Sequence, residues 1–194
     1  MSRFDPQDKY FKKAREHGYR ARSAFKLEAI QNKFHILKSG DNVLDLGAAP
    51  GSFLQYMSKV IGEKGIAVGI DLQEIESLNL PNVKTFIGDI FDDSVYEEIG
   101  IDKFDVITSD LAPKTSGIKF LDARRSLDLS LKVLDIAKNR LKKGGYVVIK
   151  ILSGFNEGDL ISEAKELFKT VKKFRPDAVR KSSGEKYVVC LNKI

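Results

Sequence analysis

The stretch Val43–Phe53, VLDLGAAPGSF, decides the fold of this chain. It begins with an apolar run that reaches Asp45, passes through a turn with Gly47 and Gly51, and enters the apolar-periodic segment FLQYMSKVI. This order predicts a strand, a glycine turn and a helix, an arrangement in which α/β proteins hold nucleotide-like ligands. The glycines do not have the G-x-G-x-x-G spacing of dinucleotide-binding proteins, and no Gly-Lys-Ser/Thr follows as in a P-loop.

Predicted strands and helices alternate on both sides of this stretch. Helices are expected at about 22–34, 51–61, 94–99, 121–141 and 157–169, and strands at about 42–46, 66–71, 83–87, 104–110, 146–151, 170–175 and 186–192. The early alternation predicts a parallel sheet with helices on both faces. The last two strands have no helix between them and predict an antiparallel hairpin at one edge. We therefore predict an α/β, Rossmann-like fold with a seven-stranded, mostly parallel sheet.

Length and composition are those of a soluble globular protein. The 194 residues are 42% hydrophobic and 31% charged, and they predict a single domain over 1–194. Because no apolar run reaches the roughly 20 residues that cross a bilayer, and the start lacks a signal core, we expect a cytoplasmic protein without membrane association. The one cysteine, Cys190, cannot form an internal disulfide and is expected in the core. With two histidines no metal cluster is apparent, and no metal is expected.

The charge is unevenly distributed along the chain. The net charge of +6 divides into +6 over residues 1–38, −8 over 39–137 and +8 over 138–194. Basic segments at both ends suit a phosphate backbone, although the solvated faces of lysine-rich helices would give the same counts. Residues 1–20 mix aromatic and cationic side chains and could form an ordered or a mobile arm. We expect the basic arm and helix of residues 1–38 to contribute to nucleic-acid binding.

Polar residues at strand ends are the candidates for ligand binding, because ligands of such sheets lie beyond the carboxyl ends of the strands. Asp71 ends the second strand, where it could accept hydrogen bonds from ribose hydroxyls, and Asp89 follows the third, where it could accept from an adenine amino group. Phe53 follows the glycine turn and could line the pocket. Each has an ordinary alternative: a strand-end cap, a turn aspartate and a core contact. The ordered series, continued by Asp110 after the fourth strand, is more specific than any member.

The D-L-G-x-x-P-G pattern resembles motif I of the S-adenosylmethionine (SAM) methyltransferases. From about Tyr19 to Cys190 the chain also resembles the FtsJ/RrmJ family of RNA ribose 2′-O-methyltransferases, through YRARSAFKL, DLGAAPG, SDLAP, VVIK and an S-x-E-x-Y-like segment. That family has a Lys-Asp-Lys-Glu tetrad on a SAM-dependent methyltransferase fold. The matching positions are Lys26, Asp110, Lys150 and Glu185. The chain departs from the best-known members at Ser52, where they have a second glycine.

The resemblance implies a role for each tetrad residue. Lys150 would be the base for a ribose 2′-hydroxyl, or the group that orients it, with Lys26 as a second cation nearby. Asp110 and Glu185 would fix the ammonium groups, and Asp110 would also reach the methionine end of SAM. Taken alone, Lys26 would be an ordinary surface charge of a helix and Glu185 a loop residue. Gly47, Gly51, Phe53, Asp71, Asp89 and Asp110 would form the cofactor pocket.

The implied substrate is a uridine 2′-hydroxyl of large-subunit (23S-type) ribosomal RNA in the peptidyl-transferase region, on the assembled subunit. The partner would be the large ribosomal subunit, and the enzyme a monomer. The cations expected to meet RNA are Arg20, Arg22, Lys33 and Lys114. Transfer RNA anticodon loops and messenger RNA caps are alternative substrates. A catalytically silent RNA-binding or ribosome-assembly factor and a small-molecule O-methyltransferase are alternative functions.

Overall fold

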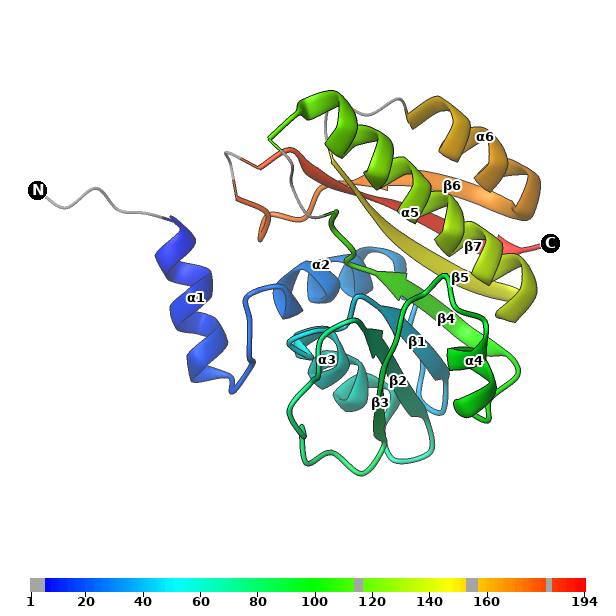
Figure 1. The fold of residues 1–194 in the computed structure, drawn as a ribbon. Helices are drawn as coiled ribbons and strands as arrows, with labels where there is room; N and C mark the ends of the chain where they lie inside the picture. Colours follow the sequence, from blue (N-terminus) through cyan, green and yellow to red (C-terminus); the bar gives the residue numbers. More distant parts are fainter. Residues whose placement is uncertain (1–5, 114–116, 153–156, 181–182) are drawn as a thin grey trace, which may run out of the picture.

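The computed structural model describes residues 6–113, 117–152, 157–180 and 183–194 (Figure 1). The helices are α1 (Pro6–Glu16), α2 (Ala24–Phe34), α3 (Ser52–Ile61), α4 (Ser94–Glu98), α5 (Lys119–Arg140) and α6 (Glu157–Leu167). The strands are β1 (Asn42–Leu46), β2 (Ile66–Asp71), β3 (Val83–Ile87), β4 (Phe104–Ser109), β5 (Leu141–Leu152), β6 (Phe168–Phe174) and β7 (Glu185–Lys193). The predicted order of elements from β1 onward is therefore confirmed.

The strands form one seven-stranded sheet in the order β3-β2-β1-β4-β5-β7-β6. The pairs β1–β2, β2–β3, β1–β4 and β4–β5 are parallel, whereas β7 pairs antiparallel with both β5 and β6. The mostly parallel sheet with a C-terminal antiparallel hairpin is thus confirmed. From β1 the chain continues to β2 and β3 on one side of β1, and then returns to form β4 on the other side of β1. A crevice for ligands is therefore expected beyond the ends of β1 and β4.

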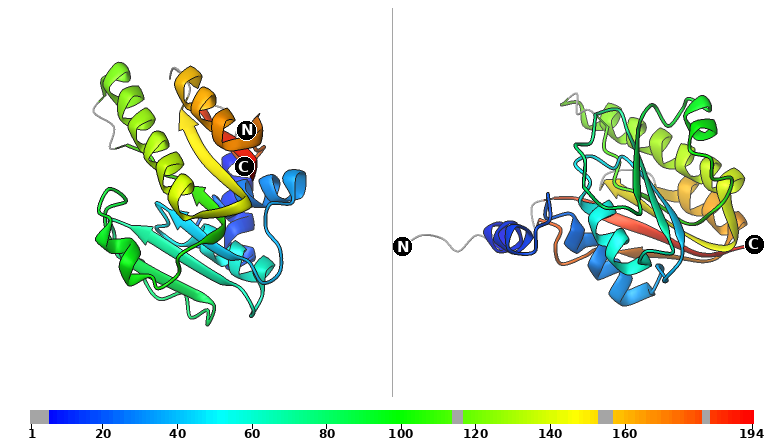
Figure 2. Two further views of the ribbon diagram at one scale, coloured as in Figure 1. Left: turned by 90° about the vertical axis from the view of Figure 1, so that its right-hand side faces the viewer. Right: turned by 90° about the horizontal axis from the view of Figure 1, so that it is seen from below.

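Helices cover both faces of the sheet, as predicted, and each face has its own core. In the left view of Figure 2, α5 and α6 lie on one side of the strands and α2 and α3 on the other. Successive side chains of a strand point to opposite faces. In β1, Val43 therefore packs with buried residues of α2 and α3, whereas Leu44 and Leu46 pack with buried residues of α4, α5 and α6. Cys190 is fully buried in the second of these clusters, as expected.

Strand β5 begins earlier than the sequence predicted. The sequence predicts this strand only from about residue 146, but β5 starts at Leu141, directly after α5. Leu141 pairs with Phe104 and Tyr146 already pairs with Val106, so four residues of β5 lie opposite one residue of β4. Gly144 has a φ of +78°, which lets the strand bulge at this point and then resume its pairing.

The N-terminal segment is helical from Pro6 on, and later residues of it are packed, which the sequence left open. Ala14 and Tyr19 are buried, and the rings of Tyr10 and Tyr19 lie 5.8 and 5.6 Å from the ring of Phe25. In α2, Phe25, Leu27 and Ile30 are buried, whereas Ala29 is only half-buried. The aromatic side chains of the basic arm thus anchor it to α2.

Two further findings concern the described residues only. None of the helices described has the length and apolar character needed to cross a membrane. Within the same residues, no three His, Cys, Asp or Glu side chains come together in an arrangement that could hold a metal ion.

Candidate active site

The glycine turn lies beyond the carboxyl end of β1, with α3 starting directly after it. Gly47 and Gly51 have φ of +78° and +99°, conformations that favour glycine. A Cβ on Gly47 would lie 2.7 Å from Leu111 Cδ2, and one on Gly51 would lie 3.0 Å from Leu78 Cδ1. Leu111 and Leu78 therefore lie so close to the backbone of this turn that a side chain at either glycine would crowd them. The predicted strand, glycine turn and helix are formed, and both backbone conformation and limited space favour glycine at the two positions.

The two acids predicted for the cofactor lie at neighbouring strand ends. Asp71 ends β2, and its carboxylate accepts hydrogen bonds from the backbone N–H groups of Ala49 and Gln73, both at 2.9 Å. Asp89 is exposed after β3 and accepts from the N–H of Phe91 at 3.0 Å. Each carboxylate oxygen has two lone pairs, so these bonds fix the acids and leave acceptor capacity for ligand hydroxyl or amino groups.

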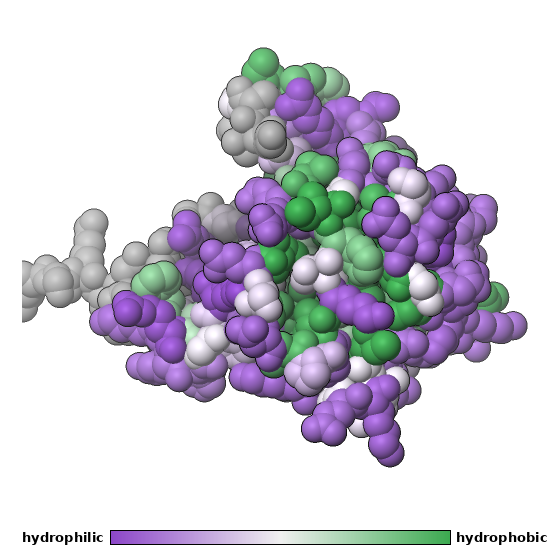
Figure 3. Space-filling model, turned by 60° about the horizontal axis from the view of Figure 1, so that its bottom comes forward, coloured by the Kyte–Doolittle hydropathy of each residue, from purple (hydrophilic) through white to green (hydrophobic). Residues whose placement is uncertain are grey.

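Apolar side chains lie exposed beside these acids. Figure 3, which brings the lower side of Figure 1 forward, shows apolar side chains gathered among polar ones. Leu72 directly follows Asp71 and is 65% exposed, and Phe91, two residues after Asp89, is 53% exposed. Exposed apolar surface next to fixed carboxylates fits a ligand with a flat base and hydroxyl groups. The residues present therefore fit an adenosine group. Phe53, in contrast, is buried in the core on the α2–α3 face, and its predicted contact with a cofactor stays a prediction.

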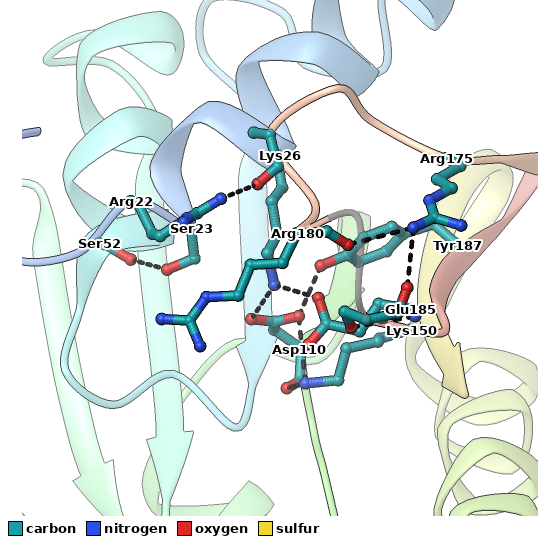
Figure 4. Close-up of polar contacts among 12 residues, drawn as sticks. Arg22, Ser23, Lys26, Ser52, Asp110, Lys150, Arg175, Arg180, Glu185 and Tyr187 are labelled. Atoms are coloured by element: carbon teal, nitrogen blue, oxygen red, sulfur yellow. Dashed lines mark hydrogen bonds and ion pairs between the residues drawn. The ribbon is translucent and has the colours of Figure 1, made fainter. Parts of the chain in front are cut away.

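The structure brings all four tetrad residues together around Asp110 (Figure 4). Lys26 Nζ lies 2.7 Å from Glu185 Oε2 and 3.8 Å from Asp110 Oδ2, and Lys150 Nζ lies 3.3 Å from Asp110 Oδ1. The Lys150 ammonium also donates to the Asp110 backbone carbonyl. The side chains of both lysines are at most 10% exposed. Two buried cations thus share two acids, so Lys26 is not the surface charge that its local sequence alone would favour.

A fifth side chain, Tyr187, completes this cluster and was not assigned a role from the sequence. Its hydroxyl donates to Asp110 Oδ1 at 2.6 Å. Burial and the adjacent Asp110 carboxylate raise the pKa of Tyr187 well above its usual range, so the hydroxyl keeps its proton. Tyr187 pairs with Lys150 across the β5–β7 ladder and lies two residues after Glu185. The E-x-Y spacing on a strand, which places both side chains on one face, was the signal that could have identified it.

Asp45, just before the glycine turn, is a second residue to which the sequence assigned no role. It is 1% exposed and accepts a hydrogen bond from the Thr108 hydroxyl at 2.6 Å. Burial raises the pKa of Asp45 to about 8, against the Thr108 hydrogen bond, which lowers it. The neighbouring acids Asp110 and Asp71 raise it further. Burial and the neighbouring acids therefore favour the protonated form of Asp45.

The cations predicted to meet RNA have different surroundings. The Arg20 guanidinium donates to three backbone carbonyls, and Arg22 Nη2 donates to the carbonyl of Ala178 at 2.6 Å. Lys33 is exposed, and its ammonium lies 4.5 Å from the ring centre of Phe174. Lys114 lies outside the described residues. Contact of these four residues with RNA stays a prediction.

The serine that departs from the best-known pattern has a partner in this chain. Ser52 is the first residue of α3 and is buried, and its hydroxyl forms a 2.6 Å hydrogen bond with that of Ser23. Ser23 directly precedes α2, but its side chain makes no capping hydrogen bond. The pair instead joins the helix that carries Lys26 to the helix that follows the glycine turn.

The family model of the FtsJ-like methyltransferases matches residues 19–193. The chain belongs to the FtsJ-like methyltransferase family. This confirms the prediction of a SAM-dependent methyltransferase, whose methyl donor fits the glycine turn and the acids described above.

Relatives and solved structures agree with this membership. The ribosomal RNA large subunit methyltransferase E of Bdellovibrio bacteriovorus is 42% identical over 194 residues, which cover 98% of each chain. The protein of the same name from an Anaeromyxobacter species is 44% identical over 189 residues, or 96% of this chain and 68% of the relative. A Plasmodium falciparum protein described as a ribosomal RNA methyltransferase has a TM-score of 0.80 at 31% identity, over 90% of this chain and 98% of that one.

A more distant solved structure shows the same fold. Fibrillarin from Aeropyrum pernix, determined with natively bound SAM, has a TM-score of 0.61 at 19% identity, over 87% of this chain and 76% of the other. At this identity the likeness concerns the arrangement of sheet and helices alone. The chain and fibrillarin therefore share a fold.

Proposed function

We propose that this FtsJ-like methyltransferase transfers a methyl group from SAM to the ribose 2′-hydroxyl of a uridine in large-subunit ribosomal RNA. The observation that carries the proposal is the tetrad itself, in which Lys26 and Lys150 both lie against Asp110 at the end of β4. The names of the relatives from Bdellovibrio and Anaeromyxobacter support large-subunit ribosomal RNA as the substrate class. The peptidyl-transferase region of the assembled subunit is the proposed target.

The chemistry requires little beyond alignment and proton removal. SAM supplies an electrophilic methyl group, and the 2′-oxygen forms a bond to that carbon as the carbon–sulfur bond breaks and the sulfur keeps the electron pair. A ribose hydroxyl is a weak acid, so its proton must leave as it attacks. Lys150, whose Nζ is held by both the carboxylate and the carbonyl of Asp110, is the group we assign to orient the hydroxyl. In its neutral amine form it receives the proton on Nζ and becomes the ammonium that Asp110 binds.

The other tetrad residues position Lys150 and the ribose. Asp110 binds both ammonium groups, and Tyr187 fixes one of its oxygens. Glu185 holds Lys26 at 2.7 Å, which keeps that second cation in place beside Asp110. Three side chains from α2, β5 and β7 thus converge on the residue that follows β4. This requires the whole sheet to be assembled before the site exists.

Further parts of the proposal concern the surroundings of the site. We propose that residues 1–194 work as one methyltransferase domain, in which the basic segment 1–38 contributes to RNA binding. Lys33, exposed beside Phe174, is the cation of the described residues that we expect to meet a phosphate, and Lys114 is a further candidate. A cytoplasmic monomer that acts on the large ribosomal subunit fits these assignments.

The decisive experiment is methyl transfer from labelled SAM to large subunits isolated from cells that lack the protein. The wild type should label the particles, and digestion to nucleosides should yield 2′-O-methyluridine. Lys150→Ala should lose at least about a thousandfold in rate, as expected for the removal of a base and orienting group. Equal labelling by the wild type and Lys150→Ala would refute the assignment.

Lys142→Ala is the matched control. Its ammonium also binds an aspartate, lying 2.8 Å from Asp105, but at the opposite end of β4 and β5. This variant should retain full activity. Free 23S-type RNA, transfer RNA and capped messenger RNA, offered in parallel, distinguish the assembled subunit from the alternative substrates. A protein that binds subunits but labels none of these RNAs would be a non-catalytic assembly factor.

A further inference from the structure

Arg20 is bound to the walls of the cofactor pocket rather than directed away from them. Its Nη1 donates to the carbonyl of Pro50 at 3.0 Å and to that of Glu76 at 2.7 Å, and its Nη2 donates to the carbonyl of Ser77 at 2.8 Å. Three of the five N–H donors of the guanidinium are therefore used on backbone acceptors. These acceptors come from two segments that are more than 20 residues apart in the sequence.

The two segments are the sides of the predicted SAM site. Pro50 belongs to the glycine turn, and Glu76 and Ser77 belong to the loop that follows Asp71 and β2. The side chain of Leu78, in the same loop, lies where a Cβ on Gly51 would be only 3.0 Å away. The loop thus closes directly over the turn. The Arg20 fork joins these segments, and the Asp71 carboxylate, bound to the Ala49 N–H, provides a second link between the end of β2 and the turn.

The position of Arg20 is itself fixed by α3. The backbone N–H of Arg20 donates to Gln55 Oε1 at 2.8 Å, and Gln55 Nε2 donates to the carbonyl of Gly18 at 2.9 Å. This reciprocal pair holds residues 18–20 against the helix that begins at the glycine turn. An arginine that binds a phosphate of RNA does not need to be anchored at both its backbone and its guanidinium, as Arg20 is.

We infer that Arg20 is a positioning residue of the cofactor pocket, which holds the 72–80 loop against the glycine turn so that the adenosine end of SAM is bound. This assigns to the cofactor side a cation that the sequence had suggested for RNA. A lysine cannot reproduce the arrangement, because its single ammonium has no planar fork with which to bridge acceptors on two segments. The inference does not depend on which RNA is methylated.

The test measures cofactor binding without RNA, by calorimetric titration of S-adenosylhomocysteine into the full-length protein. Arg20→Ala should bind about tenfold or more weakly, and Arg20→Lys should recover little of the loss, since hydrogen bonds from charged donors are strong and here directional. Arg22→Ala and Lys33→Ala are the controls, because those cations contact neither segment in the hydrogen bonds given above. Both should bind S-adenosylhomocysteine within about twofold of the wild type.

A second measurement separates this role from RNA contact. The dependence of RNA affinity on salt should keep its slope in Arg20→Lys and Arg20→Ala, whereas the loss of a phosphate contact lowers the slope by about one. Hydrogen exchange of residues 73–79 should be faster in Arg20→Lys than in the wild type, a readout that remains if Arg20→Ala fails to fold. Wild-type affinity for S-adenosylhomocysteine in Arg20→Lys, or a reduced salt slope, overturns the inference.

Discussion

The Tyr187 hydroxyl donates to Asp110 at 2.6 Å from a strand position paired with Lys150. A hydrogen bond to a charged acceptor contributes about 1.5–3 kcal/mol. Tyr187→Phe removes this bond and leaves Asp110 free to turn toward either lysine. We expect kcat for methyl transfer to fall roughly tenfold or more while affinity for S-adenosylhomocysteine is unchanged. Single-turnover assays and calorimetry measure the two quantities separately.

Tyr96→Phe is the matched control for this prediction. Tyr96 is also buried, and its hydroxyl donates to the carbonyl of Ile90 at 2.9 Å, but it lies in α4 and away from the tetrad. This variant should lose about 1 kcal/mol of stability and none of its activity. If both tyrosine variants reduced kcat equally, Tyr187 would act only through general stability and not through Asp110.

The buried carboxyl of Asp45 predicts a pH dependence of stability. Folding raises its pKa from about 3.9 to about 8, so the proton stabilises the folded state most at low pH. That contribution is lost as the pH rises toward 8. Asp45→Asn lacks this titration and keeps an acceptor for Thr108. Since one pKa unit corresponds to about 1.4 kcal/mol, the wild type should lose at least about 2 kcal/mol relative to the variant between about pH 5 and about pH 8.

Denaturant titrations of both proteins at several pH values measure this difference. Thr108→Val provides a companion, because it removes the hydrogen bond that lowers the Asp45 pKa and should extend the decline to higher pH. Parallel pH profiles for the wild type and Asp45→Asn would mean that Asp45 does not titrate in this range when folded.

Single residues were predictable where a motif names them, and less so where only pairing across the sheet defines them. Lys26, Asp110, Lys150 and Glu185 are matched by family order, and the structure brings them together. Tyr187 requires knowledge that β7 runs antiparallel to β5 in one particular register. The burial of Asp45 likewise depends on β4, which supplies Thr108 from 63 residues away. Local sequence contains neither relation.

At the level of elements, the glycine turn offers a comparison within one chain. Gly47 and Gly144 both have a φ of +78°, but a Cβ on Gly144 would have no atom within 4 Å, whereas one on Gly47 would be 2.7 Å from Leu111 Cδ2. Gly144→Ala should therefore cost only the left-handed backbone strain of about 1–2 kcal/mol. Gly47→Ala should cost more and weaken S-adenosylhomocysteine binding about tenfold.

Thermal unfolding and calorimetry on both variants distinguish strain from crowding. The double variant Gly47→Ala/Leu111→Ala should recover the part of the loss that comes from the clash and not the part that comes from φ. If Gly47→Ala and Gly144→Ala had equal effects on stability and cofactor affinity, the turn would not be closely packed against the loop after β4.

Most elements follow from periodicity and turn residues, and the exceptions have tertiary causes. The start of β5 was missed because glycines at 144 and 145 suggest a turn, while pairing with Phe104 extends the strand across them. Helix α1 was left open because its sequence is strongly polar and basic. Its order comes from Ala14, which is buried, and from Tyr10, whose ring lies against Phe25.

For the whole molecule, the uneven charge distribution gives a prediction about the substrate. The segments 1–38 and 138–194 have net charges of +6 and +8, whereas the middle has −8. Lys9 and Arg15 are exposed on α1, and Lys84 is exposed on β3 in the acidic middle. If RNA lies across the basic ends, a variant that lacks charges on α1 releases fewer counterions when RNA binds. A variant that lacks charges on β3 is unchanged at the interface and releases as many as the wild type.

We therefore compare Lys9→Ala/Arg15→Ala with Lys64→Ala/Lys84→Ala, which remove equal charge from α1 and from the middle of the chain. Binding of single-stranded ribosomal RNA fragments changes with salt by a slope of about −0.7 for each phosphate contact. In the first variant that slope should be about 1.4 less negative, and activity should be lost mainly near physiological salt. The second should keep both the slope and the activity. Equal behaviour of the two variants would show that net charge alone, and not the basic arm, attracts the RNA. A salt-independent affinity would point to a small-molecule substrate.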